Sequence, residues 1–242
     1  MNGIEIVGIQ KNSLIDYPGK IVSTVFLNKC TFRCPFCHNP ELVLNTDSNR
    51  IKAEELIEFL EKEKKWIDGI CLTGGEPTLH EALPEFISRV KEKGFLVKLD
   101  TNGTNPVMLK ELIEGKKLDY IAMDIKGPLE RYEEIVKSKV NEKAIQESIE
   151  LIRNSGIEYE FRTTVVPEIF LDGDEERIGE WLKGSKKYVL QQFNNEHKLL
   201  DHSFQHLQAF SPQKMQEIKE KMNPYFEKVE LRGVPTALKK EN

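Results

Sequence analysis

The sequence lacks several features that mark whole classes of protein. It has no apolar stretch long enough to span a membrane and no apolar N-terminal signal region, so we expect neither a membrane protein nor a secreted one. Its net charge of −5 offers no strongly basic surface, which argues against nucleic acid as a partner. Only four cysteines occur in 242 residues, which excludes a disulfide scaffold and suits a reducing cytoplasm. No internal repeat or linker interrupts the chain, so residues 1–242 are interpreted as one domain.

Three of the four cysteines, Cys30, Cys34 and Cys37, lie together with the spacing C-x3-C-x2-C. Three thiolates in one short loop can hold three irons of a [4Fe–4S] cluster and leave the fourth iron without a protein ligand. Clusters that only transfer electrons are usually closed by four cysteines, whereas an open iron can bind and activate a small molecule. The spacing therefore predicts a catalytic cluster with these three cysteines as ligands.

A structural zinc site is the alternative for clustered cysteines, with His38 as its fourth ligand. Cys37 and His38 are sequence neighbours, however, and paired zinc ligands are normally separated by two or more residues. The chain has no second CxxC pair, and three closely spaced thiols cannot all form disulfides. The spacing favours the open cluster and leaves a non-catalytic, zinc-stabilised binding module as the competing interpretation.

Two apolar runs, residues 21–27 and 69–73, predict buried strands on either side of the cysteine loop. The second run leads into Gly74-Gly75-Glu76-Pro77. Paired glycines let a backbone approach a ligand closely, and the Glu76 carboxylate can accept hydrogen bonds from an ammonium group. Taken alone, this segment would equally fit a turn before a helix.

The cysteine motif followed by Gly-Gly-Glu-Pro resembles the radical S-adenosylmethionine superfamily. Further segments make the chain similar to the activating enzymes of glycyl radical proteins. The resemblance is closest to the anaerobic ribonucleoside-triphosphate reductase activating proteins and more distant to the pyruvate formate-lyase activating enzymes. The segments that carry this resemblance are Asp16-Tyr17-Pro18-Gly19, His38-Asn39-Pro40, Asp100-Thr101-Asn102-Gly103 and Met123-Asp124-Ile125-Lys126. They do not identify the substrate.

The resemblance implies a reaction as well as a family. S-adenosylmethionine would chelate the open iron, and its reductive cleavage would give methionine and a 5′-deoxyadenosyl radical that abstracts a hydrogen atom. The implied product is a glycyl radical on a partner enzyme, most closely an anaerobic ribonucleotide reductase. A radical enzyme acting on a small molecule or on RNA is the alternative. Because the chain lacks cysteines for a second cluster, we expect one cluster and an external flavodoxin- or ferredoxin-like electron donor.

The resemblance also implies which residues contact the cofactor. Gly74-Gly75-Glu76 are expected beside the methionine moiety, and Phe36 is expected near the adenine. Asp100 matches an aspartate that helps to bind a monovalent cation beside the carboxylate of S-adenosylmethionine. Asp100 and Asn102 could instead cap the turn before a helix, which is a common role of these residue types.

Further polar residues are expected at the same site. Asp124 and Lys126 end a predicted strand and would lie near the adenosyl group and the substrate, with a mutual surface ion pair as the alternative. His38, next to the cluster ligand Cys37, is expected to contact the cofactor. Arg162 lies in a β-rich run, where an arginine is costly unless paired. Its expected partner is the methionine carboxylate or Glu76.

Asp16 matches a loop that, in the activase group, meets the glycyl peptide, so it is the candidate catalytic residue. A Pro-Gly turn explains the same segment equally well. Cys71 lies in an apolar run and is interpreted as a small core residue. The late histidines occupy a polar stretch and are expected to be solvated: His197, His202 and His206.

The order of predicted elements indicates an α/β fold. Strands are expected at residues 21–27, 70–73, 95–99, 120–124, 158–166, 188–192 and 228–231. Helices are expected at residues 51–65, 84–93, 106–114, 141–155, 175–183 and 212–221. Repeated βα units imply parallel strands with helices outside. The resemblance implies a partial (β/α)6 TIM-like barrel with its site at the C-terminal ends of the strands. The tail, residues 239–242, is expected to fray.

Overall fold

The computed structural model describes residues 4–46 and 50–235, whose contacts group them into two compact units. The first unit comprises Met1–Arg33, Asn39–Met123 and Asn141–Tyr159. The second comprises Cys34–His38, Asp124–Val140 and Glu160–Asn242. The interpretation as one domain stays a prediction, and the tail at residues 239–242 lies outside the described residues.

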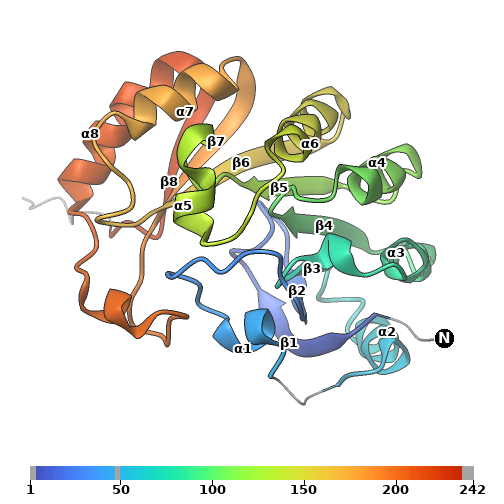
Figure 1. Cartoon of the computed structure of the whole chain (residues 1–242). Coiled ribbons are helices and arrows are strands. Elements are labelled where there is room, and N and C mark those ends of the chain that lie inside the picture. The colour runs from blue at the N-terminus through green and yellow to red at the C-terminus, as the bar shows by residue number, and fades with distance from the viewer. Residues whose placement is uncertain (1–3, 47–49, 236–242) are drawn as a thin grey trace, which may run out of the picture. The chain divides into compact units, whose positions relative to one another are not determined.

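The sheet of the first unit has the strand order β1, β2, β3, β4, β5 (Figure 1). Its strands are β1 Ile6–Ser13, β2 Val22–Leu27, β3 Gly69–Gly74, β4 Leu96–Thr101 and β5 Tyr120–Asp124. From β2 to β5 neighbouring strands are parallel, which confirms the predicted βα organisation. β1 was not predicted and runs antiparallel to β2. Its second half is polar, with Gln10, Lys11 and Asn12 exposed, so it has no apolar alternation that would mark a strand.

The helices of the first unit begin and end largely as the sequence predicts. They are α1 Pro40–Leu44, α2 Ala53–Lys62, η1 Pro77–Leu79, α3 Leu83–Glu92, α4 Pro106–Glu114 and α6 Glu142–Asn154. Asn105 and Asn141 cap α4 and α6. Their side chains accept hydrogen bonds from the backbone N–H groups of Met108 and Ala144, in the first turns of these helices. Gly94 and Gly156, at φ values of 83° and 73°, follow α3 and α6 as predicted. The short helix α1 was not predicted.

The second unit contains a parallel sheet in the order β6, β7, β8. These strands are β6 Glu158–Val165, β7 Ser185–Gln192 and β8 Phe226–Arg232. Its helices are η2 Leu129–Arg131, α5 Tyr132–Val136, α7 Asp174–Leu182, η3 His202–His206, α8 Pro212–Met222 and η4 Asn223–Tyr225. The predicted strands and helices of this region are confirmed, whereas α5 was not predicted because it has only five residues.

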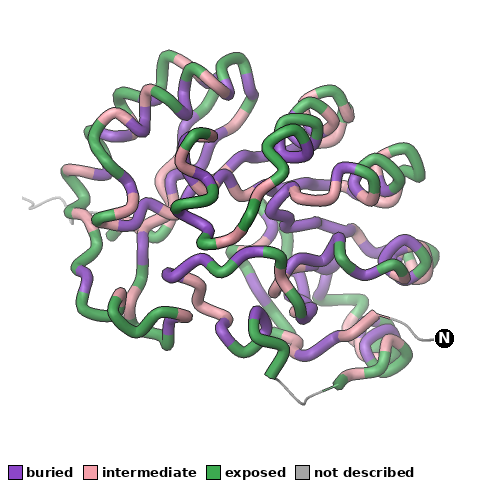
Figure 2. Tube along the Cα trace, viewed as in Figure 1, coloured by how far each residue is buried: buried purple, intermediate pink, exposed green. Residues whose placement is uncertain are grey.

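The sheet of the first unit has two chemically different faces. Side chains alternate between the faces of a strand. Leu72 on β3 and Leu99 on β4 are apolar register partners on one face. The opposite face carries Thr24, Cys71 and Lys98 as register partners on β2, β3 and β4. Figure 2 shows these strands buried, with the exposed turns of α3, α4 and α6 outside them. A polar row is therefore enclosed within the fold.

The parallel strands of the first unit bring the sequence motifs to one edge. Cys30 follows the end of β2, Gly74 ends β3, and Asn102 follows β4. Because parallel strands end at the same edge of a sheet, these three segments lie together, as the sequence predicts. Among the described helices, none combines the length and the apolar composition needed to cross a membrane.

Candidate functional site

The two glycines at the end of β3 are required by a close approach between segments of the chain. The Gly75 N–H donates to the Leu27 carbonyl at 2.7 Å, and the Glu76 N–H donates to the Lys29 carbonyl at 2.7 Å. A Cβ on Gly75 would lie 1.9 Å from the Lys29 carbonyl oxygen, and one on Gly74 would lie 2.4 Å from that of Leu27. The glycines thus let β3 dock against the backbone that leads into Cys30. Their contact with the methionine moiety stays a prediction.

Glu76 is fully buried and accepts hydrogen bonds from protein groups at both carboxylate oxygens. Oε1 accepts from the Thr78 N–H at 3.1 Å, the Thr78 hydroxyl at 2.6 Å and the Thr101 hydroxyl at 2.8 Å. Oε2 accepts from the Asn102 N–H at 2.6 Å. Burial raises the pKa of Glu76, and the hydrogen bonds from Thr78, Asn102 and Thr101 oppose this rise. Glu76 therefore ties the ends of β3 and β4 together, and its contact with an ammonium group of a ligand stays a prediction.

Asn102 links the end of β4 to the first motif cysteine. Its Nδ2 donates to the Thr31 hydroxyl at 3.1 Å and to Cys30 Sγ at 3.8 Å. Its Oδ1 accepts from the Thr104 N–H at 3.0 Å, so the residue also forms the turn that the alternative interpretation expects. The Phe32 N–H donates to Cys30 Sγ at 3.4 Å. Two N–H groups are thus directed at the sulfur of Cys30.

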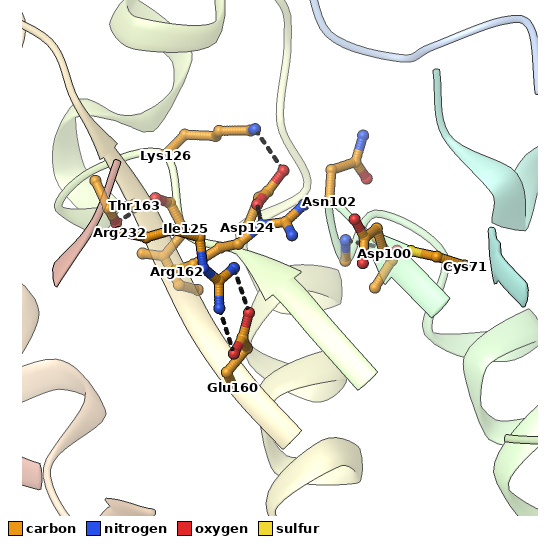
Figure 3. A network of polar contacts seen from close by, with 12 residues as sticks. Cys71, Asp100, Asn102, Asp124, Ile125, Lys126, Glu160, Arg162, Thr163 and Arg232 are labelled. Carbon is orange, nitrogen blue, oxygen red and sulfur yellow. Dashed lines mark hydrogen bonds and ion pairs between the residues drawn. The ribbon is translucent and has the colours of Figure 1, made fainter. Parts of the chain in front are cut away.

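Asp100 does not act as a simple turn cap, because it forms an ion pair within the enclosed polar row. The ammonium of Lys98, two residues earlier on β4, donates to Asp100 and also to Cys71 Sγ at 3.6 Å. Lys98 is 1% exposed. Cys71 is a fully buried core residue, as predicted, and packs with Tyr17, Val22 and Tyr120 on the same face as Lys98 (Figure 3). The sequence interpretation missed Lys98, although its place two residues before Asp100 in an apolar strand was a signal.

The segment Cys34–His38 is held by the late polar stretch of the second unit. The Leu200 N–H donates to the Cys37 carbonyl at 3.0 Å, and the Asp201 N–H donates to the Pro35 carbonyl at 2.9 Å. His38 Nε2 lies 2.6 Å from the Asn194 carbonyl oxygen, and its ring stacks on Phe193 at 6.5 Å between ring centroids. Phe36 is buried. No local pattern in the sequence indicated this support, because its partners are more than 150 residues apart.

Asp124, Lys126 and Arg162 form one charged group in the second unit (Figure 3). Asp124 pairs with Lys126 at 3.0 Å and with Arg162. Burial would raise the pKa of Asp124, but the two cations outweigh it and hold the pKa below its usual range. Burial would lower the pKa of Lys126, but Asp124 and the nearby Cys34 thiol raise it. The structure thus brings these residues together and pairs Arg162 with Asp124, while a contact of Arg162 with the methionine carboxylate stays a prediction.

Glu160 is a buried charge that the sequence interpretation missed. Its carboxylate accepts two hydrogen bonds from Arg232, at 2.8 and 3.0 Å, and pairs with Lys187 at 3.2 Å (Figure 3). Burial raises the pKa of Glu160, but Arg232, Arg162 and Lys187 outweigh this and lower it to about 2. Glu160 and Arg162 face the same side of β6, two residues apart. A charged face therefore continues along this strand.

Asp16 lies on the loop between β1 and β2. This loop precedes β2, so it lies at the end of that strand opposite Cys30. The carboxylate accepts a hydrogen bond from the Thr24 hydroxyl at 2.6 Å, and the Asp16 N–H donates to Ser13 Oγ at 3.2 Å. Because Thr24 belongs to the enclosed polar row, Asp16 reaches that row from the opposite end. Its contact with a glycyl peptide stays a prediction.

The late histidines are exposed, as predicted: His197, His202 and His206. His202 Nδ1 lies 3.0 Å from Gln205 Oε1. Across residues 4–46 and 50–235, no group of three or more His, Cys, Asp or Glu side chains is arranged as a ready metal site. The assignment of the cluster ligands therefore rests on the cysteine motif and on the family.

The donor set fits an iron–sulfur cluster better than it fits an added cation. Three motif cysteines supply thiolates, and the N–H groups of Phe32 and Asn102 point at the sulfur of Cys30. Hydrogen bonds to cluster sulfurs are a usual means of setting the reduction potential. The monovalent cation expected at Asp100 does not fit, because the carboxylate already has the ammonium of Lys98 as a counter-ion.

Comparison with known proteins identifies the family. Residues 24–178 match the family model of the radical SAM superfamily. MJ1227 of Methanocaldococcus jannaschii, which is named as a glycyl-radical enzyme activating enzyme, is 35% identical over 237 residues. The match covers 95% of this chain and 96% of the relative.

Solved structures confirm the predicted fold class. SuiB of Streptococcus suis, bound to its precursor peptide SuiA, has a TM-score of 0.65 at 12% identity. The match covers 84% of this chain and 46% of SuiB, so the chain spans under half of that protein. A domain of pyruvate-formate lyase-activating enzyme from Bacteroides vulgatus has a TM-score of 0.53 at 16% identity, covering 68% of this chain and 99% of that domain. At these identities the likeness shows the fold, a mostly parallel α/β sheet of the partial-barrel type.

Proposed function

Since the chain belongs to the radical SAM superfamily, and within it to the glycyl-radical enzyme activating enzymes, we propose that it generates a glycyl radical on a partner enzyme. The residues proposed to hold its single [4Fe–4S] cluster are Cys30, Cys34 and Cys37. When bound, the cluster and S-adenosylmethionine supply the reductive cleavage and the hydrogen-atom abstraction. Family membership makes the chain an enzyme, so the zinc-stabilised, non-catalytic module is wrong.

The residues of this chain bind and orient the reacting groups. Asn102 and the Phe32 N–H orient Cys30, while Glu76 joins the strand ends beside it. Leu200 and Asp201 hold the loop that carries Cys37. Hydrogen abstraction requires close placement of the reacting atoms, so these supports are expected to affect the rate more than the cofactor content.

The proposed partner is an anaerobic ribonucleoside-triphosphate reductase. Its support is the resemblance carried by Asp16-Tyr17-Pro18-Gly19 and His38-Asn39-Pro40. With cysteines for one cluster alone, the electron would come from a flavodoxin- or ferredoxin-like donor. A cytoplasmic, anaerobic setting suits a cluster with an open iron, because oxygen attacks exposed iron–sulfur centres. The observation that carries the proposed glycyl radical activation, though not the choice of partner, is the 35% identity to MJ1227 along 95% of the chain.

The experiment is activation of a candidate glycyl radical enzyme. The reconstituted, reduced protein is incubated anaerobically with S-adenosylmethionine and either an anaerobic ribonucleotide reductase or a pyruvate formate-lyase. Electron paramagnetic resonance then detects the glycyl doublet, and chromatography measures 5′-deoxyadenosine. We expect a doublet with the reductase and a matching amount of 5′-deoxyadenosine. The protein with Cys34→Ala is expected to give neither product, whereas Cys71→Ala should keep its iron and sulfide.

Two outcomes would contradict the proposal in different ways. A doublet formed with the lyase but not with the reductase would refute the proposed partner and keep the class of reaction. Cleavage of S-adenosylmethionine without a doublet on either partner would instead favour the small-molecule or RNA alternative. Reconstituted protein that cleaves no S-adenosylmethionine would contradict the proposed reaction itself.

A further inference from the structure

The enclosed polar row of the first unit contains a cation that belongs to the protein itself. Lys98 lies in the middle of the sheet on β4, between β3 and β5. It is 1% exposed, and lysines are almost never buried to this extent unless they are paired. Its ammonium donates to the Asp100 carboxylate and to the sulfur of Cys71. The charge is therefore held in place by neighbours on two strands.

The position of this ammonium is fixed by the strands and not by a flexible side chain alone. Lys98 and Asp100 face the same side of β4 because side chains alternate along a strand. Cys71 is the register partner of Lys98 on β3. Asp100 is 8% exposed and lies two residues before Asn102, which contacts Cys30. The ion pair therefore stands directly beside the edge at which the cysteine motif lies.

The charge balance of this group leaves no place for an added monovalent cation. One buried carboxylate faces one buried ammonium, so the pair is neutral. A K⁺ or Na⁺ ion at Asp100 would bring a second positive charge close to Lys98 in a site with little water to screen it. Like charges repel each other strongly in such surroundings. The ion would thus have to displace the ammonium of Lys98, whose side chain is 1% exposed.

We propose that the ammonium of Lys98 takes the place of a monovalent cation at Asp100, so that this enzyme binds S-adenosylmethionine without K⁺ or Na⁺. Lys98 is then a positioning residue, which holds the Asp100 carboxylate in place and supplies the positive charge next to the cofactor site. This inference rests on the proposed function for its link to S-adenosylmethionine. The occupancy of Asp100 by Lys98 is independent of that function and can be tested separately.

The test compares wild type with Lys98→Met, which keeps a side chain of similar length and removes the charge. Lys98→Arg is the conservative variant that keeps it. Lys91→Met is the matched control, because it removes the ammonium from another Lys–Asp pair of the same unit, with Asp119 at 2.7 Å. Each reconstituted protein is exchanged into buffer whose only inorganic monovalent cation is added stepwise as KCl. Equilibrium dialysis then measures the affinity for S-adenosylmethionine, with tetramethylammonium chloride as the ionic-strength control.

We expect the affinity of wild type, Lys98→Arg and Lys91→Met to be unchanged by KCl. Without KCl, Lys98→Met should bind about tenfold or more weakly, as for a lost charge-assisted hydrogen bond, and KCl should restore part of the loss. Wild type that requires K⁺ or Na⁺ would overturn the proposal. So would Lys98→Met that binds as tightly as wild type without added cation.

A titration with Tl⁺, a surrogate for K⁺ that is observed by nuclear magnetic resonance, tests the occupancy of Asp100 without S-adenosylmethionine. We expect a saturable Tl⁺ site in Lys98→Met that is lost in Lys98→Met/Asp100→Asn and is absent from wild type. A saturable site in wild type that Asp100→Asn removes would refute the inference. If no variant binds S-adenosylmethionine, the proposed function fails while this titration still decides the role of Lys98. If Lys98→Met does not fold, as judged by circular dichroism, wild type and Asp100→Asn still decide it.

Discussion

Replacement of Glu76 by alanine should destabilise the protein far more than a surface substitution would. The fully buried carboxylate accepts four hydrogen bonds, two of them from the backbone N–H groups of Thr78 and Asn102. The hydroxyl donors, on Thr78 and Thr101, can rotate toward other acceptors, but the two N–H groups cannot. A buried donor without a partner costs about 1–3 kcal/mol. Two of them, together with the space left by the side chain, should lower the free energy of unfolding by about 3–5 kcal/mol.

Thermal unfolding followed by circular dichroism measures this loss. For a protein of this size, each 1 kcal/mol lowers the Tm by roughly 2–4 °C, so Glu76→Ala should lower it by about 6–20 °C. Glu76→Gln keeps one acceptor oxygen but replaces the other with an NH2 group, which faces hydrogen-bond donors. The fall in Tm of this variant should therefore be intermediate. Glu58→Ala, on an exposed position of α2, is the matched control and should change the Tm little.

The size of the effect decides between two roles of Glu76. If Glu76 served only to bind a ligand, Glu76→Ala would leave the Tm of the ligand-free protein within about 3 °C of wild type. The substitution would then weaken only the binding of S-adenosylmethionine. Such a result would refute the argument that Glu76 holds the ends of β3 and β4 together. A large fall in Tm without the ligand supports it.

Two further substitutions test other parts of the structure. Gly75→Ala places a Cβ 1.9 Å from the Lys29 carbonyl oxygen, so we expect a loss of several kcal/mol, on the order of 3, and poor cluster incorporation; normal iron content and Tm would contradict this. Glu160 has a folded-state pKa of about 2, below its unfolded value, so its ion pairs stabilise the protein above about pH 4.5, and this contribution, about 3 kcal/mol, is lost as the pH falls toward 2. Glu160→Gln should therefore flatten the acid dependence of stability in that window, and an unchanged dependence measured by denaturant unfolding would contradict the assignment.

The fold could be predicted from the sequence where local pattern and tertiary environment agree. The buried runs that became β3 and β5 are continuous and apolar, as central parallel strands must be. β1 escaped prediction because its second half is polar, and α5 because five residues give too little periodicity. These misses fall where an element is short or lies at an edge, so its sequence carries little signal.

The site could be predicted only as far as its motifs are contiguous. The order of Cys30, Gly74 and Asn102 after successive strands followed from the βα pattern, because parallel strands end at one edge. The support of Cys37 by Leu200 could not follow, since no periodicity relates residues so far apart in the chain. The junction that Glu76 makes between the ends of β3 and β4 could not be predicted either, because two of its donors are backbone N–H groups, which every sequence contains.

Lys98 shows what a stricter use of alternation would have found. In the run from Val97 to Asp100, apolar and polar residues alternate, which is the pattern of a strand with one solvated face. A strand with parallel partners on both sides, followed by a helix, is not expected to have a solvated face. The alternating pattern and the central position of the strand agree only if the polar face is buried. A buried lysine requires an anion as its partner. Asp100, two residues on and on the same face, is that anion. The pair could therefore have been inferred before any coordinate was known.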